Sequence, residues 1–115
     1  MTDTRTGIER IVDERARQIA KEGWTPEHDD QHVKGELAVA GALYATPIPL
    51  LEMREREDPH RFVFLDPWPG WWAEEWDKRL KERSASATTD ERIRELEKAG
   101  ALIAAEIDRL LRKRT

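Results

Sequence analysis

Apolar and polar residues alternate with helical spacing in two long stretches of the chain, one near each end. In the first stretch the apolar stripe repeats every three or four positions, through Ile8, Ile11, Val12, Arg15 and Ile19. This spacing predicts an amphipathic helix over residues 7–22 that buries one stripe. Gly23 is expected to end the helix in the left-handed conformation, with Trp24 folding back onto its last turn.

The second stretch has the clearest pattern in the chain and predicts a helix over residues 90–113. Its stripe alternates spacings of three and four for nearly three heptads, through Ile93, Leu96, Gly100, Ile103, Ile107 and Leu110. Thr88 and Glu91 fit a capping box at its start, and Gly100 lets another helix or a ligand come close. The stripe serves equally well inside one monomer or between copies, so a homodimer or a higher homo-oligomer is allowed.

The middle of the chain predicts shorter elements. Thr25 and Pro26 have the composition of a helix start, followed by a short turn through Asp30. A second helix is expected over residues 33–45, with its inward positions at Leu37, Ala40, Leu43 and Tyr44.

The two prolines at positions 47 and 49 end that helix. Residues 50–54 suggest a further short helical segment, and residues 62–64 a brief extended piece. A third helix is expected over residues 71–83, where Trp72, Trp76 and Leu80 share one face.

The predicted fold is a single all-α domain, residues 1–115, of three to four helices with a long loop rich in proline and tryptophan. The chain has no cysteine, no apolar secretion signal at its start and no run of eighteen apolar residues. These features indicate a cytoplasmic protein without a membrane span. A net charge of −4 argues against broad nucleic-acid binding.

The densest set of candidate ligands lies between the first two helices, in residues 22–32. On a helix His28 and His32 would share a face that Glu36 continues, and two imidazoles with a carboxylate suit a transition metal. Carboxylates alone would suit Mg²⁺ or Mn²⁺. A metal-free polar ligand site is a further alternative. In the purely structural alternative Asp29 and Asp30 cap the next helix, and His32 is solvated. The cofactor is therefore open, with a divalent metal as the candidate.

Four of the five tryptophans fall within nine residues, and they allow two roles. Trp72 and Trp76 have the spacing of core residues. Trp68 and Trp71 flank a Pro-Gly turn and are candidates for stacking on a planar base, with Arg94 or Lys98 holding a phosphate. The predicted ligand-binding residues are Trp24, Glu27, His28, Asp29, Asp30, Trp68, Trp71, Arg94 and Lys98.

Several motifs together resemble a family of small uncharacterised proteins encoded by tailed phages and prophages. The motifs are residues 14–19 (ERARQI), 22–30 (EGWTPEHDD), 35–38 (GELA), 44–45 (YA), 94–103 (RELEKAGALI) and 105–110 (AEIDRL). Members of that family usually carry Trp-Trp-Lys-Pro before the last helix, whereas here Trp72 is followed by Ala73 and Glu74. A more distant similarity is to the repeat domain of ryanodine receptors. The phage resemblance implies an accessory role in nucleotide metabolism or in countering host defence.

Three functions are carried forward. The first is a binding protein that captures a nucleotide-derived small molecule, such as a host defence signal, without turnover. The second is a metal-dependent nucleoside-triphosphate pyrophosphohydrolase, in which Mg²⁺ would be held by Glu27, Asp29, Asp30, Glu36 and Glu106. The third is a protein inhibitor that covers the surface of a host enzyme. The first is preferred because the polar cluster lacks a recognisable catalytic arrangement.

Overall fold

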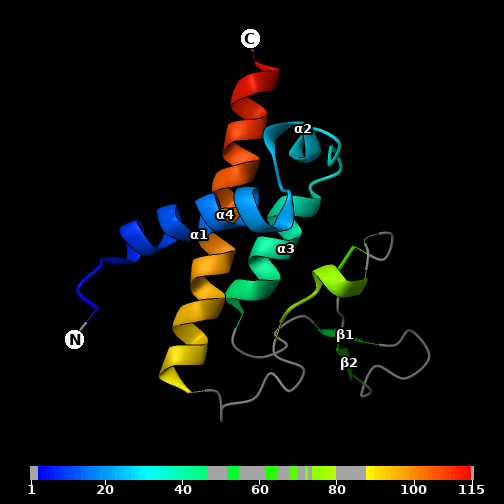
Figure 1. Cartoon of the computed structure of the whole chain (residues 1–115). Coiled ribbons are helices and arrows are strands. Elements are labelled where there is room, and N and C mark those ends of the chain that lie inside the picture. Colours follow the sequence, from blue (N-terminus) through cyan, green and yellow to red (C-terminus); the bar gives the residue numbers. More distant parts are fainter. Residues whose placement is uncertain are drawn as a thin grey trace.

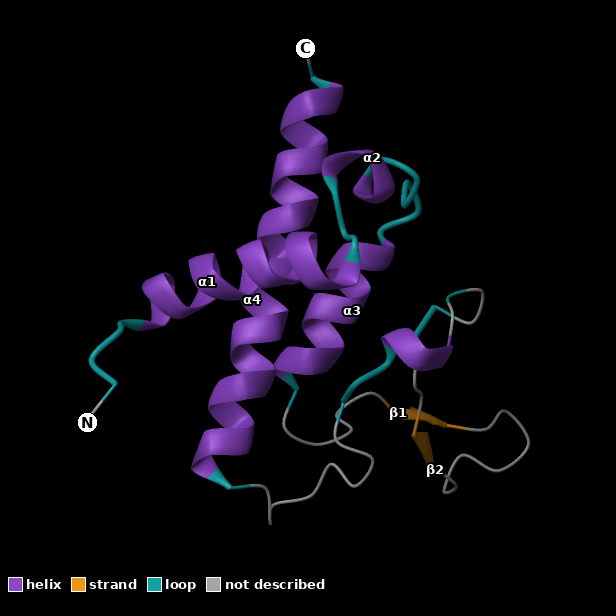
Figure 2. Ribbon diagram, in the orientation of Figure 1, coloured by secondary structure: helices purple, strands orange, loops and turns teal. Residues whose placement is uncertain are grey.

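The computed structural model describes residues 3–46, 52–54, 62–64, 68–69, 72, 74–79 and 88–114. Four α-helices dominate this part of the chain: α1 (Gly7–Glu22), α2 (Pro26–Asp29), α3 (Glu36–Ala45) and α4 (Thr89–Lys113) (Figure 1). A 3-10 turn, η1 (Glu74–Trp76), and two three-residue strands, β1 (Glu52–Arg54) and β2 (Phe62–Phe64), complete it (Figure 2). The predicted all-α fold class is confirmed.

Local signals set the ends of the two long helices. Each begins with a capping box, in which a threonine and a glutamate three residues later accept one another's backbone N–H: Thr6 with Glu9, and Thr88 with Glu91. Gly23 ends α1 with φ 74°, in the left-handed region that glycine adopts without steric cost. The helices predicted over residues 7–22 and 90–113 are therefore confirmed to within one residue.

Helix α4 is the element against which the other helices pack. Helices α1, α2 and α3 all contact it, and α1 crosses it while α3 runs alongside (Figure 1). The crossing is close at Gly100, because a Cβ atom placed there would lie 2.5 Å from Cδ1 of Ile11. The close approach predicted at Gly100 is confirmed, and α1 is the neighbour.

The large apolar residues of the stripe on α4 face outward. Its large residues, which we call the outer stripe, are all exposed by more than a third of their surface: Ile93, Leu96, Ile103, Ile107 and Leu110. The side of α4 turned toward the protein is built mostly from small or charged residues, including Glu95, Ala99, Ala105 and Glu106, together with Leu102. Of the two alternatives that the pattern left open, burial inside the monomer does not hold for these five residues.

Helix α1 shows the same reversal. Ile8 is 77% exposed and Val12 is 61% exposed, whereas the buried residues of α1 are Glu14 and Gln18. The prediction that α1 buries its apolar stripe was wrong for Ile8, Val12 and Ile19, whereas Ile11 is half-buried against Gly100 of α4. The charged side of α1 faces inward because it meets charged partners there, which are described below.

The core that remains is small and rich in aromatic residues. It joins Trp24, Leu37, Ala40, Tyr44, Trp72, Ala99, Leu102 and Ala105, with Trp68 and Trp76 partly buried against it. The core role expected for Trp72 and Trp76 is thus confirmed, as are the inward positions of Leu37, Ala40 and Tyr44. Leu43 is only partly buried.

Three shorter elements differ from the prediction. Helix α3 starts at Glu36 rather than 33, because Gly35 just before it takes a left-handed φ of 81°. The helical segment expected at 50–54 is strand β1 over its described residues, and β2 matches the predicted extended piece. The helix expected over 71–83 is only η1 where it is described, followed by non-helical residues 77–79; Leu80 lies outside the described residues.

None of the helices described is both long enough and apolar enough to cross a membrane.

Candidate functional site

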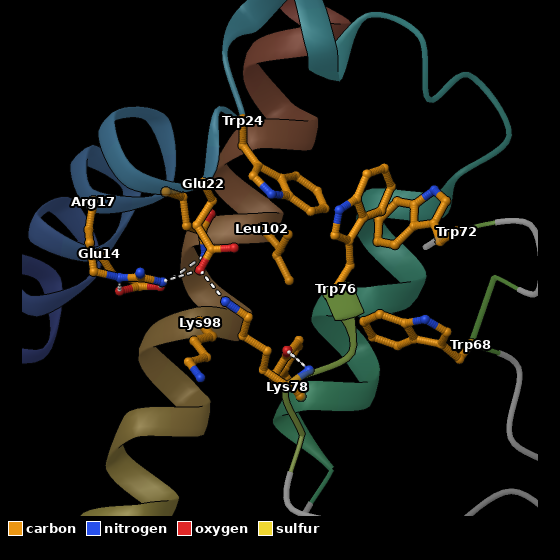
Figure 3. Close-up of a pocket in the computed structure, with 12 residues that line it drawn as sticks. Glu14, Arg17, Glu22, Trp24, Trp68, Trp72, Trp76, Lys78, Lys98 and Leu102 are labelled. Carbon is orange, nitrogen blue, oxygen red and sulfur yellow. Dashed lines mark hydrogen bonds and ion pairs between the residues drawn. The ribbon is translucent and has the colours of Figure 1, made fainter. Parts of the chain in front are cut away.

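A cavity lies between charged side chains of α1 and α4 and a group of aromatic side chains from the rest of the chain (Figure 3). Its volume is about 30 Å³, roughly two to three times the smallest cavity volume that holds one ordered water. Leu102 of α4 contributes to its apolar lining. The lining residues are Glu14, Arg17, Gln18, Glu22, Trp24, Tyr44, Trp68, Trp72, Trp76, Lys78, Lys98 and Leu102.

The aromatic wall is held together by edge-to-face contacts, the arrangement that aromatic pairs prefer. Trp24 is positioned by the turn at Gly23, and its ring centroid lies 5.3 Å from those of both Trp72 and Trp76. Trp68 extends the wall, 5.6 Å from Trp72 at an interplanar angle of 85°. Four indoles from two distant parts of the sequence therefore form one apolar surface beside the cavity.

Tyr44 closes the wall on the side of α3. Its hydroxyl accepts a hydrogen bond of 2.9 Å from the backbone N–H of Lys78. Burial raises the pKa of Tyr44 to about 12, so the hydroxyl stays protonated at neutral pH. It can donate a hydrogen bond but does not supply a negative charge.

The opposite wall is charged and centres on Glu14, which is almost fully buried. Its carboxylate lies 2.7 Å from Nε of Arg17 and 2.7 Å from Nη1 of Arg94, and it accepts a hydrogen bond of 3.1 Å from Gln18. Burial by itself would raise the pKa of Glu14, but the hydrogen bonds from the two guanidinium groups outweigh it and the pKa is lowered. Glu14 is therefore an ionised, buried carboxylate that joins two partly exposed arginines.

A second carboxylate, Glu22, extends this network toward the aromatic wall. It lies 3.1 Å from Nη2 of Arg17 and 3.0 Å from Nζ of Lys78 (Figure 3). Burial opposes ionisation of Glu22, but the hydrogen bonds from Lys78 and Arg17 prevail and lower its pKa. The two carboxylates are thus both engaged by cations.

Lys98 differs from these cations because no carboxylate pairs with it among the described residues. Its Nζ lies 5.8 Å from the ring centroid of Tyr44, within the range of a cation–π contact. Burial lowers the pKa of Lys98, and repulsion from Arg94 lowers it further. The described lining carries three cations against two carboxylates, and Lys98 is the cation left over.

The two histidines lie behind the aromatic wall and not in the cavity lining. The His28 and His32 rings lie 4.8 Å apart, and they contact Trp24, Trp72 and Trp76 at 4.9 to 6.2 Å. Nδ1 of His32 lies 3.4 Å from Oε2 of Glu36. Burial and the nearby His28 lower the pKa of His32. His32 is buried, so the alternative that leaves it solvated was wrong.

The predicted metal ligands His28, His32 and Glu36 gain no support from this arrangement. Over the described ranges, no group of three or more His, Asp or Glu side chains is placed to hold a metal ion. Three of the other carboxylates proposed for Mg²⁺ form ion pairs with arginines: Asp29 with Arg15, Asp30 with Arg112 and Glu106 with Arg109. The metal site therefore stays a prediction from the sequence.

Asp29 and Asp30 cross-link the α2 segment to the long helices. Asp29 is fully buried, and its carboxylate lies 2.8 Å from Nη2 of Arg15. Nη1 of the same arginine donates a hydrogen bond to the backbone carbonyl of Trp24. Asp30 is exposed and lies 2.8 Å from Nη2 of Arg112 on α4. The idea that both aspartates cap the next helix was wrong, since Gly35 is the N-cap residue of α3.

The structure brings together part of the predicted site. Trp24, Trp68 and Lys98 line the cavity, and Arg94 lies one contact behind it through Glu14. Trp71 lies outside the described residues. The remaining predicted residues do not line this cavity: Glu27, His28, Asp29 and Asp30.

The charged wall was not predicted from the sequence, and neither was Tyr44 as a lining residue. The charged wall is made by Glu14, Arg17, Glu22 and Lys78. A signal for part of it was present. Glu14, Arg17 and Gln18 follow the helical spacing of three and four on the side of α1 away from its apolar stripe. Such a row is usually solvated, and only the packing of α1 on α4 turns it inward.

Comparison with protein-family models, with curated proteins and with solved structures finds no match for this chain. The resemblance to phage-encoded proteins and the weaker similarity to the ryanodine-receptor repeat domain therefore stay predictions from the sequence.

Proposed function

We propose that the chain is a binding protein for a small anionic ligand with a planar ring, of the nucleotide type, and that it holds this ligand without turnover. The resemblance to phage-encoded accessory proteins gives such binding a setting in the host cytoplasm. There the protein would sequester a nucleotide-derived signal used in host defence.

The observation that carries this proposal is Lys98, which lies opposite the tryptophan wall and pairs with no carboxylate of the described residues. A half-buried ammonium group without a carboxylate is costly, and an anionic ligand would supply the missing charge. Phosphate groups are bound by lysine and arginine through charge-assisted hydrogen bonds. Arg17 and Lys78 stand beside Lys98 in the lining, although Glu14 and Glu22 already engage them.

The aromatic wall suits the planar part of such a ligand. Bases stack on indole faces with little preference for sequence, because every base has a π-face. In this structure the indoles pack edge to face on one another, and the volume of about 30 Å³ is far below the roughly 300–1,000 Å³ of pockets that hold drug-sized ligands. Binding a nucleotide therefore requires Trp68, Trp72 and Trp76 to separate from the charged wall.

This requirement makes tryptophan fluorescence a direct readout of binding. Four of the five tryptophans contribute to the cavity wall, so a ligand that enters between the walls changes the surroundings of most indoles at once.

Two observations favour binding over catalysis. The described carboxylates of the cavity are ionised and paired with cations, so neither is a poised general acid or base. Tyr44, whose pKa is raised, is a poor nucleophile at neutral pH. Within the described part of the chain no contact favours the pyrophosphohydrolase alternative, and three of its proposed Mg²⁺ ligands, Asp29, Asp30 and Glu106, are each engaged by an arginine.

The test is calorimetry and fluorescence with a panel of cyclic dinucleotides, ADP-ribose-type nucleotides and deoxynucleoside triphosphates. We expect at least one to bind wild-type protein. Lys98→Gln should weaken its affinity by about 10- to 100-fold, the range for a hydrogen bond to a charged group. Lys113→Gln, on the last turn of the same helix and outside the cavity lining, is the matched control and should bind as wild type.

The ligand recovered after incubation should be chemically intact. Release of pyrophosphate in the presence of Mn²⁺ would favour the hydrolase over the binding protein. Absence of heat and of fluorescence change across the whole panel would refute the proposal, as would equal affinities for Lys98→Gln and Lys113→Gln.

A further inference from the structure

The face of the protein opposite the cavity is unusually apolar. On α4 the outer stripe is exposed along its whole length, from 36% at Ile93 to 53% at Ile107. On α1, Ile8 and Val12 are still more exposed. Soluble monomers rarely expose contiguous apolar patches of this kind, because such surface is stabilised by removal from water.

The N-terminal end of the outer stripe adjoins α1. A groove of about 310 Å³ runs between α1 and α4 and is lined by Gly7, Arg10, Ile11, Ile93, Leu96 and Glu97. Its two charged residues are already paired, since Nη1 of Arg10 lies 3.0 Å from Oε2 of Glu97. A partner in this groove would therefore meet apolar side chains and an ion pair that needs no further counter-charge. We call the face of α4 formed by the outer stripe the apolar face.

The apolar face and the cavity lie on different sides of α4. Lys98 and Leu102 are one turn apart on the side of α4 that lines the cavity. At 100° per residue, the outer stripe lies on the far side of the helix from them. An occupant of the apolar face would leave the cavity accessible.

We propose that the apolar face is a homodimer interface, in which the α4 helices of two copies pack along their outer stripes about a two-fold axis. This inference does not depend on the proposed function. It also separates two roles within one helix, because one side of α4 lines the ligand cavity and the other joins the copies.

The exposed area is compatible with a second copy. The five large side chains of the outer stripe, each exposed by between about a third and a half, amount to on the order of 400 Å², about half of the roughly 800 Å² that each partner contributes to a stable interface, and the side chains that flank the stripe would contribute the rest. Association of two such faces about a two-fold axis buries the same patch on both copies.

The spacing of the outer stripe also selects the occupant. Alternating steps of three and four over nearly three heptads are the pattern of two long helices packed nearly parallel or antiparallel along their length. Within the monomer α1 crosses α4 at Gly100 and does not run along this stripe (Figure 1). A stripe of 18 residues extends about 27 Å at 1.5 Å per residue, and the α4 of a second copy matches it in length, spacing and chemistry.

The test is sedimentation equilibrium of the full chain over a range of concentrations. We expect wild-type protein to sediment at twice 13.4 kDa. Leu96→Lys and Ile107→Lys place a charge within the apolar face and should raise the dimer dissociation constant by about two orders of magnitude or more. Lysine suits a helix at least as well as isoleucine, so α4 itself should persist.

Val33→Lys is the matched control. Val33 is 65% exposed and apolar but lies after α2, beside Arg109 and Arg112 and away from the outer stripe. This variant should dimerise as wild type. Circular dichroism and tryptophan fluorescence of all three variants report whether the monomer fold is retained.

A second measurement places the interface without disrupting it. The chain has no cysteine, so Ile103→Cys and Val33→Cys each offer one site for a spin label. We expect a shorter distance between copies for labels at position 103, near the middle of the outer stripe, than for labels at position 33.

Two results would overturn the proposal. One is a wild-type protein that stays monomeric at the highest soluble concentration, which would assign the apolar face to a different protein. The other is a dimer that persists in Leu96→Lys and Ile107→Lys, or whose labels lie closer at position 33. Loss of ligand binding alone would leave the dimer untouched, so the two proposals fail separately.

Discussion

The neighbouring aspartates Asp29 and Asp30 provide the sharpest test of the packing described for α2. Each forms an ion pair of 2.8 Å with an arginine of a long helix. They differ in burial: the side chain of Asp29 is 0% exposed and that of Asp30 is 50% exposed. Substitution of each by asparagine keeps the shape and removes the charge, so the pair of variants isolates the effect of burial.

Asp29→Asn should lower the free energy of unfolding by about 3–5 kcal/mol, because it leaves a charged Arg15 with only 13% of its side chain exposed. That loss is a large share of the roughly 5–15 kcal/mol that stabilises a typical domain. Asp30→Asn should cost little, since water and salt screen an exposed pair before and after the change.

The assay is urea unfolding at one fixed protein concentration, followed by tryptophan fluorescence. The backbone carbonyl of Trp24 accepts a hydrogen bond from Arg15 of the Arg15–Asp29 pair, so the fluorescence of Trp24 reports on this region. The double variant Arg15→Gln/Asp29→Asn should recover part of the lost stability, because no buried charge remains unpaired. Equal costs for Asp29→Asn and Asp30→Asn would refute the packing of α2 against α1.

Three further predictions follow from single contacts. Gly100→Ala should lower the free energy of unfolding by about 1–3 kcal/mol, because the new Cβ would lie 2.5 Å from Cδ1 of Ile11. In urea unfolding, the double variant Gly100→Ala/Ile11→Ala should recover part of this loss. If the losses of the two single variants simply add in the double variant, the close approach is contradicted. Folding lowers the pKa of His32, so the neutral imidazole contributes its full stabilisation above pH 6.5, and this stabilisation is lost as the pH falls below 6.5. Thermal melts should show this loss of stability for the wild-type protein and a flatter pH dependence for His32→Gln. Identical pH profiles for the two proteins would contradict the prediction. Tyr44→Phe leaves the backbone N–H of Lys78 without this acceptor and should cost about 0.5–1.5 kcal/mol in unfolding free energy; a loss well below that range would show that Tyr44 contributes only through packing.

The ends of the helices could be predicted from the sequence because their causes are local. The capping boxes of Thr6 and Thr88 and the glycine at position 23 act within a few residues of chain. The shorter elements were harder, because strand β1 forms only by pairing with β2, eight or more residues away along the chain.

The candidate site could be predicted only in part, and Lys98 and Glu14 illustrate the limit. Lys98 was identified as a phosphate ligand from its place on the last helix, and the cavity includes it. Glu14 was missed, because a carboxylate on an amphipathic helix is normally solvated. It is buried here since Arg94, eighty residues later, reaches it from α4.

The sequence by itself determined the all-α class, the two long helices and the residues that start and end them, because capping and helical periodicity depend on neighbours in the chain. Only the tertiary structure decided which side of each long helix faces inward. The amphipathic pattern separates an apolar side from a polar side but does not say what covers either. In this protein ion pairs and tryptophans fill the inside, and the apolar face is left exposed on the outside.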